Sequence, residues 1–295
     1  MFQENHLSPN DFIVPLFITE GKNIKEDIKS MPDYYRMSID LIKKEVKLLW
    51  EMGLKSVLLF PKIEKSLKNN TGSEALNPNG LIQRAIKEIK NSIPEMVIMT
   101  DVALDPYSSY GHDGIVENGK IINDLTVEIL KKMAVSHASC GADVIAPSDM
   151  MDGTIKNIRL ELEKEKFHET LIMSYSAKYA SNFYGPFRNA LDSSPGFGDK
   201  KTYQIDFHNS KQAIRKTITD IEEGADIVMI KPGLTYLDIV KELSSMINIP
   251  IASYQVSGEY SMLKAAAKKG YIDYEKTIYE QLIAFKRAGA KLIAS

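Results

Sequence analysis

Two lysines stand at the ends of apolar runs that should form buried β-strands. Lys178 ends the run LIMSYSAK, and Lys231 ends the run IVMIK. Burial disfavours a protonated amine and lowers its pKa, and a second nearby cation lowers it further. A neutral amine attacks carbonyl carbons and forms Schiff bases. A single lysine at a strand end more often extends to solvent. A pair on adjacent predicted strands favours a catalytic site for carbonyl substrates.

Eight short apolar runs alternate with longer amphipathic stretches. Near-continuous hydrophobicity in the runs is typical of parallel strands that are covered on both faces. The predicted strands are 13–18, 56–61, 96–104, 143–149, 170–178, 226–232, 249–256 and 291–295. The predicted helices include 38–52, 78–93, 124–140, 210–223 and 235–246, and Ser38 is a suitable N-cap for the first of them.

A helix end, a glycine and a buried strand follow one another repeatedly, in the segments EMGLKSV, SCGADVI, EEGADIV and RAGAKLI. This junction favours an α/β fold of the (β/α)8 TIM-barrel type over a doubly wound sheet. No linker-like segment divides the chain, which predicts a single domain over residues 1–295. Catalytic residues of such barrels lie at the carboxyl ends of the strands. Those ends are polar here, at 101–113, Ser148, Asp149 and 254–257.

The composition excludes several classes of partner. The 295 residues carry 37 Lys and Arg against 39 Asp and Glu, a formal net charge of -2, which argues against nucleic acid or a membrane surface. Cys140 is the only cysteine, so neither an intrachain disulfide nor a thiolate metal cluster can form. No signal peptide is recognisable, and no apolar run approaches the ~20 residues that span a bilayer. We expect a cytoplasmic protein.

Five segments together resemble the porphobilinogen synthase (5-aminolaevulinate dehydratase) family. They are DVALDPYSSYGHDG (101–114), APSDMMDG (146–153), SYSAKYASNFYGPFR (174–188), DIVMIKPG (226–233) and SYQVSGEY (253–260). The resemblance runs from about Leu7 to the last residue. It implies the condensation of two 5-aminolaevulinate molecules to porphobilinogen, with loss of two waters, in the biosynthesis of haem and other tetrapyrroles.

The same resemblance implies roles for individual residues. Lys231 matches the Schiff-base lysine for the first substrate, and Lys178 matches the lysine for the second. Ser257 matches a residue that helps to hold the carboxylate of the first substrate, with Tyr254 close to Lys231. The residues that match those holding the carboxylate of the second substrate are Arg188, Lys200 and Gln204. The stretch 189–201 matches the family's active-site lid, and its Ser, Gly, Pro and Asp content independently predicts a mobile loop.

The residues at the metal-binding positions of the family differ in this chain. Zinc-dependent relatives carry three cysteines where this chain has Ala103, Asp105 and Asp113, so the resemblance predicts no zinc. Four side chains could instead hold Mg²⁺ or handle protons, namely Asp101, Asp105, His112 and Asp113. A second Mg²⁺ site of many relatives falls at Thr154 and Lys216, where a lysine would repel the cation, so we expect that site to be missing. No cofactor is predicted to be required.

The match departs from the family at both ends. Residues 1–12 resemble a remnant of the N-terminal arm that builds an octamer in relatives, so we expect a homo-oligomer such as a dimer. The chain stops at Ser295, before the final helix and a substrate-binding Tyr of the family, and we expect weakened activity. The alternative is a truncated, inactive relative that acts only as a folded or interaction subunit. A one-lysine class I aldolase is a weaker third interpretation.

Overall fold

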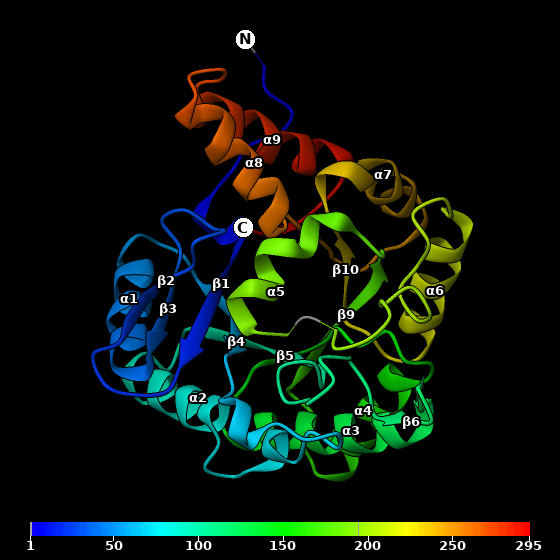
Figure 1. Cartoon of the computed structure of the whole chain (residues 1–295). Coiled ribbons are helices and arrows are strands. Elements are labelled where there is room, and N and C mark those ends of the chain that lie inside the picture. Colours follow the sequence, from blue (N-terminus) through cyan, green and yellow to red (C-terminus); the bar gives the residue numbers. More distant parts are fainter. Residues whose placement is uncertain (1, 194) are drawn as a thin grey trace.

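The eight apolar runs pair side by side and close into a parallel barrel, within a computed structural model that describes residues 2–193 and 195–295 (Figure 1). Strand β1 pairs with β12 through Phe12 and Ile293, which closes the ring. The barrel strands are β1 (Phe12–Thr19), β4 (Ser56–Pro61), β5 (Val97–Val102), β8 (Val144–Pro147), β9 (Leu171–Lys178), β10 (Ile227–Lys231), β11 (Ile251–Tyr254) and β12 (Leu292–Ala294). The predicted (β/α)8 fold is confirmed, since each predicted run forms one of these strands.

Amphipathic helices surround the ring because each buries one apolar face against the outer side of the strands. The helices anticipated from the sequence are α1 (Ile39–Glu51), α2 (Leu81–Ser92), α3 (Asn123–Ser139), α6 (Lys211–Glu222) and α7 (Leu237–Met246). Further helices are α4 (Thr154–Lys164), α5 (Gly185–Leu191), α8 (Ser257–Lys268) and α9 (Tyr274–Ala288). Helix α5 crosses the mouth of the barrel (Figure 1). Two small ribbons complete the fold, β2 (Lys25–Asp27) with β3 (Tyr35–Ser38) and β6 (Val116–Glu117) with β7 (Lys120–Ile121).

The repeated helix-to-strand junction has a common geometry. Gly141 follows the C-cap of α3 with a φ of 104°, a conformation that side chains other than glycine rarely adopt. Two residues later, Asp143 Oδ2 accepts a hydrogen bond of 2.7 Å from the amide of Ile98 on the neighbouring strand. The same carboxylate pairs with Lys90 of α2 at 2.7 Å. The junction that contains Gly224 repeats this arrangement with Asp226, the amide of Ile172 and Arg159.

The core has two layers. One lies inside the barrel, where alternate residues of the strands such as Phe17, Phe60 and Met99 face one another. The other lies between the barrel and the helices. Above the inner layer, at the carboxyl ends of the strands, the apolar side chains give way to charged ones. Among the described residues, no helix is both long and apolar enough to cross a bilayer.

Candidate active site

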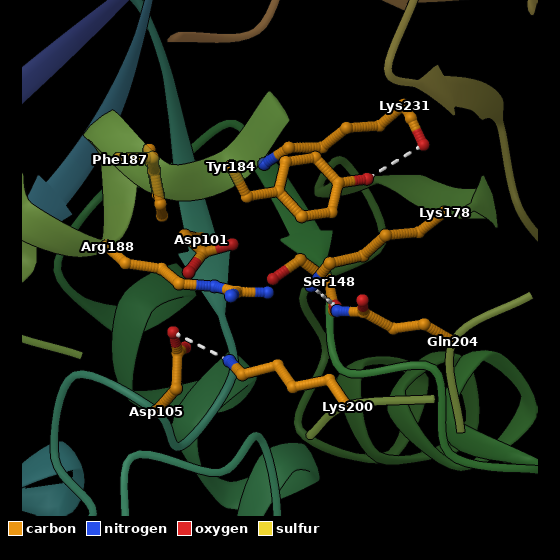
Figure 2. Close-up of a pocket in the computed structure, with 10 residues that line it drawn as sticks. All are labelled: Asp101, Asp105, Ser148, Lys178, Tyr184, Phe187, Arg188, Lys200, Gln204 and Lys231. Atoms are coloured by element: carbon orange, nitrogen blue, oxygen red, sulfur yellow. Dashed lines mark hydrogen bonds and ion pairs between the residues drawn. The ribbon is translucent and has the colours of Figure 1, made fainter. Parts of the chain in front are cut away.

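The two lysines predicted from the sequence lie side by side inside the barrel. Lys178 of β9 and Lys231 of β10 are register partners, and both side chains point into one pocket (Figure 2). Their exposed fractions are only 7% and 5%. The register of two parallel strands therefore brings together two amines that are 53 positions apart in the sequence.

A β-bulge in β9 decides the direction of Lys178. In β10, Ile227, Met229 and Lys231 alternate regularly toward the barrel interior. In β9, Met173 and Tyr175 face the interior, so strict alternation would turn Lys178 outward. The register shifts between Val228 and Ile230, whose partners in β9 are Ser174 and Ala177. The extra residue of β9 reverses the alternation, and Lys178 faces the pocket.

Aromatic rings surround the amine of Lys231. Its Nζ lies 4.5 Å from the ring centroid of Tyr254, 4.7 Å from Phe187, 5.1 Å from Tyr175 and 5.5 Å from Tyr184. Burial, followed by the positive charge of Lys178, lowers the pKa of Lys231 from 10.5 to about 7. A substantial fraction of this amine is therefore neutral at physiological pH, as a nucleophile for carbonyl groups requires.

Lys178 has a more polar environment than Lys231. Its Nζ donates a hydrogen bond to the carbonyl oxygen of Ser148, the residue that follows β8 by one position. It also lies 3.8 Å from Asp113 Oδ2. The positive charge of Lys178 is one of the causes that lower the pKa of Lys231.

Three carboxylates lie near the lysines, Asp101 at the end of β5 and Asp105 and Asp113 in the loop that follows it. Burial, and next the charge of Asp105, raises the pKa of Asp101 to about 7. The Oδ1 atom of Asp101 has no hydrogen-bond partner among the described residues. Burial opposes ionisation of Asp113, but Lys178 and Lys200 outweigh it and hold the pKa of that carboxyl below its usual range. Asp101 can therefore exchange a proton near neutral pH, whereas Asp113 stays ionised.

Lys200 occupies the space between two of the candidate metal ligands. Its Nζ lies 2.9 Å from Asp113 Oδ1 and 3.3 Å from Asp105 Oδ2. Burial opposes its charge, but the two carboxylates outweigh burial and raise the pKa of Lys200. Within residues 2–193 and 195–295, no three His, Cys, Asp or Glu side chains form a group that could hold a metal ion. The carboxylates as arranged do not fit a Mg²⁺ ion, because an ammonium group already neutralises two of them.

His112 lies apart from this pocket. Its ring nitrogens contact the carbonyl oxygen of Phe197 and the hydroxyl group of Tyr203, both at 3.1 Å. The structure thus does not place the His112 ring with Asp101 and Asp105, two of the three carboxylates with which it was predicted to hold a metal ion or handle protons.

Helix α5 delivers the next group of predicted residues. Arg188 lines the pocket from this helix, and Lys200 and Gln204 line it from the segment that follows. The end of α5 is fixed by Arg36 of β3, whose Nη1 donates to the carbonyl oxygens of Asn189 and Ala190 at 3.2 and 3.0 Å. The predicted lid 189–201 begins at this point, and its residue 194 lies outside the described residues.

Ser257 and Tyr254 line an adjoining apolar pocket. The Ser257 hydroxyl accepts a hydrogen bond of 2.9 Å from the amide of Phe187. Because Phe187 also lines the pocket of the lysines, its ring separates two adjacent pockets. The arrangement can hold two small molecules side by side, with Lys231 and its aromatic surroundings at the boundary.

Sequence reasoning did not single out several residues of the site. They are Tyr175, Tyr184 and Phe187, which fall in the quoted segment 174–188 and lie around Lys231 Nζ. Tyr184 lies three positions before Phe187 and four before Arg188, and this spacing in a short helical segment was the only available signal for a shared face.

Thr154 and Lys216 lie on the outer side of the barrel. Lys216 Nζ pairs with buried Asp220, which accepts a hydrogen bond of 2.6 Å from Ser174 of β9. Thr154 donates to Asp149 Oδ1 at 2.9 Å, and burial raises the pKa of Asp149 to about 6. A lysine ammonium thus supplies positive charge at the place where a second metal was predicted to be missing. The absence of a metal requirement stays a prediction.

Comparison with known proteins connects this geometry to a family. The model of the delta-aminolevulinic acid dehydratase family matches residues 1–295. The chain is 51% identical over 293 residues to the delta-aminolevulinic acid dehydratase of Archaeoglobus fulgidus, covering 99% of this chain and 90% of that protein. It is 53% identical over 294 residues to the chloroplastic delta-aminolevulinic acid dehydratase 1 of Arabidopsis thaliana, covering 99% of this chain and 68% of that protein.

A solved structure is similar throughout. The delta-aminolevulinic acid dehydratase (porphobilinogen synthase) of Toxoplasma gondii ME49, crystallised with the reaction product porphobilinogen, superposes with a TM-score of 0.98 at 49% identity, covering 99% of this chain and 84% of that one. These coverages give no support to the alternative of a truncated, inactive relative, and the expected loss of activity is not borne out.

Proposed function

The chain belongs to the delta-aminolevulinic acid dehydratase family, and we propose that it condenses two 5-aminolaevulinate molecules to porphobilinogen through lysine Schiff bases. Two molecules lose two waters in this reaction. The observation that carries the proposal is the pairing of Lys178 and Lys231 in register inside one buried pocket. A one-lysine aldolase would not need the second amine.

Lys231 forms the Schiff base with the first substrate. Its neutral Nζ attacks the keto carbon, a C–N bond forms, and the carbonyl oxygen leaves as water after it takes up protons. The rings of Tyr254, Phe187 and Tyr184 exclude water from the amine and keep its pKa low. Ser257 and Tyr254 line the adjoining pocket, where the carboxylate of this substrate is held.

Lys178 holds the second substrate through its own keto group. It loses its proton before it attacks, and Asp101, whose pKa of about 7 lets it exchange protons near neutrality, lies in the same pocket to accept it. Arg188 makes no ion pair with any described residue and lines the pocket, so its guanidinium is free to bind a carboxylate. Gln204, whose Oε1 has no partner among the described residues, and Lys200 complete this subsite.

We propose activity without divalent cations because Lys200 already balances Asp105 and Asp113, and Lys216 balances Asp220. A homo-oligomer such as a dimer and a cytoplasmic location remain part of the proposal, and light scattering of the purified protein measures the first.

Trapping the intermediate tests the function. The protein is incubated with 5-aminolaevulinate and a chelator, reduced with borohydride, and digested for peptide mass spectrometry. We expect an adduct on Lys231, with or without one on Lys178, and porphobilinogen in unreduced samples. The matched control is K201M, which removes the exposed lysine next to Lys200 and should leave the adduct unchanged. Folded protein without an adduct on either Lys178 or Lys231 would rule the proposal out.

A further inference from the structure

Two consecutive residues of the loop after β5 hold the turn that carries Lys200. His112 Nε2 lies 3.1 Å from the carbonyl oxygen of Phe197, and His112 Nδ1 lies 3.1 Å from the hydroxyl oxygen of Tyr203. The amide of Asp113 donates to the same Tyr203 oxygen at 3.3 Å, and its carboxylate accepts from Lys200 Nζ at 2.9 Å. One dipeptide therefore fixes the turn at three points.

Donors and acceptors match throughout this contact. The Phe197 carbonyl can only accept, so His112 Nε2 carries a hydrogen atom. The Tyr203 hydroxyl group bonds with both residues of the dipeptide, because its oxygen accepts from the Asp113 amide and lies within hydrogen-bond distance of His112 Nδ1. Burial raises the pKa of Tyr203 well above its usual range, so the hydroxyl group keeps its hydrogen atom.

Packing reinforces the hydrogen bonds. The His112 side chain is 1% exposed, and its ring lies 4.6 Å from the ring centroid of Phe197. Tyr110 packs edge-on against Phe197 at 5.8 Å, and its carbonyl accepts from the amide of Gly196 at 2.8 Å. Both ring nitrogens of His112 are occupied, so it is not available to bind a metal ion or to carry protons to the pocket.

Tyr203 sits between two residues of the second-substrate subsite. The amide of Gln204 donates to the carbonyl oxygen of Lys200 at 3.0 Å, so the three residues form one turn. Lys200 and Gln204 line the lysine pocket, whereas Tyr203 and His112 line a separate crevice on the outer side of the segment. A displacement of Tyr203 would move both pocket residues together.

We propose that His112 and Tyr203 are positioning residues for the second substrate: they make no contact with the pocket, but they fix the turn 200–204 so that Lys200 and Gln204 face the substrate carboxylate. This inference rests on the proposed function, because it takes the second-substrate subsite as given. It assigns His112 a role different from the metal or proton-handling role considered from the sequence.

Removing single hydrogen-bonding groups tests the proposal. Y203F and H112F each delete the contact while they keep an aromatic ring, and H112Q keeps a donor for Phe197 but has no polar atom in the place of Nδ1. We expect the KM for 5-aminolaevulinate to rise about tenfold in Y203F and H112F, and less in H112Q, with a smaller change in kcat. Trypsin should cleave these variants faster after exposed Lys201.

Controls separate positioning from general damage. Y110F removes the hydroxyl of a tyrosine on the same surface, and H208N replaces an exposed histidine, so both should keep the wild-type KM. The borohydride-trapped adduct on Lys231 should stay at the wild-type level in Y203F and H112F, because the first-substrate site does not depend on the turn. If H112F does not fold, H112Q tests whether His112 positions the turn 200–204.

The possible results distinguish a failure of the proposed function from a failure of the positioning role. A wild-type protein that forms no Lys231 adduct would refute the proposed function itself. A wild-type adduct with unchanged KM and unchanged tryptic cleavage in Y203F and H112Q would overturn the positioning role alone. A parallel loss of the Lys231 adduct, activity and melting temperature would also overturn it, because it would identify His112 and Tyr203 as residues that stabilise the whole fold.

Discussion

Lys178 lies directly opposite Lys231 because β9 contains one residue more than β10 over the same stretch of barrel wall. Met173 and Tyr175 fill the interior below Lys178, and the bulge lets the lysine face the same side as they do. Two amines thus share one low-dielectric pocket. Burial and the repulsion between the two ammonium groups together lower the pKa of Lys231 to about 7.

Loss of either amine should abolish turnover. K231M and K178M each remove a group that forms a covalent bond with substrate, so we expect kcat to fall at least about a thousandfold. Steady-state assays of porphobilinogen formation measure this. K178M should still give the Lys231 adduct after borohydride reduction, whereas K231M should not. Residual activity within tenfold of the wild type in K231M would contradict the assignment.

K231M should also be more stable than the wild type. The pKa of Lys231 is lowered in the folded state, so protonation favours the unfolded state. This destabilisation is largest below pH 7, shrinks as the pH rises, and vanishes above the unfolded pKa of about 10.5. We expect K231M to raise the free energy of unfolding by roughly 2–4 kcal/mol at pH 7, measured by urea denaturation. The gain in the free energy of unfolding should diminish toward pH 10. A gain that does not change with pH would argue that the Lys231 amine does not have a lowered pKa in the folded protein.

The rate should rise with pH through neutrality. The neutral fraction of Lys231 increases as the pH passes its pKa of about 7, so log kcat/KM should climb below that value and level off above it. The negative charge of Asp101 raises the pKa of Lys231, and D101N should therefore shift this acidic limb to lower pH. If the acidic limb of the pH profile has the same midpoint in D101N as in the wild type, whatever the remaining activity, a group other than Lys231 determines it.

Arg188 should affect the second substrate more than the first. R188Q removes a guanidinium that can bind a carboxylate with two hydrogen bonds, so we expect the KM to rise about ten- to a hundredfold. R188K should recover only part of the loss, because an ammonium group cannot form the two-point contact. Initial-rate kinetics measure both, and the Lys231 adduct serves as the control for the first-substrate site.

Removal of divalent cations should leave activity and stability unchanged. Dialysis against a chelator, with metal analysis before and after, tests this, and a sharp loss of activity would refute it.

The ammonium group of Lys216 should stabilise the fold by neutralising a buried carboxylate, as a bound cation would. K216M leaves buried Asp220 with the Ser174 hydroxyl but without its ion-pair partner, and we expect the free energy of unfolding to fall by roughly 3 kcal/mol. K241M, on an adjacent helix, is the control for removing a lysine.

The sequence by itself determined the barrel and the identity of its reactive groups. Apolar runs and repeated glycine junctions are local signals, because strand burial and helix termination depend on neighbouring residues. The lysines at the run ends and the family motifs indicated Schiff-base chemistry before any geometry was known. Boundaries differed from the predictions by up to three residues, as between 78–93 and Leu81–Ser92.

Only the tertiary structure decided which groups meet. His112 is adjacent to Asp113 in the chain, yet its ring packs against Phe197 and Tyr203, about 90 positions away, rather than joining the carboxylates. The bulge that turns Lys178 inward cannot be recognised in the sequence of an apolar run, because its position depends on the register with β10. The pKa of Lys231 likewise depends on burial and on a cation supplied by another strand. These properties arise from long-range contacts, which a sequence pattern does not specify.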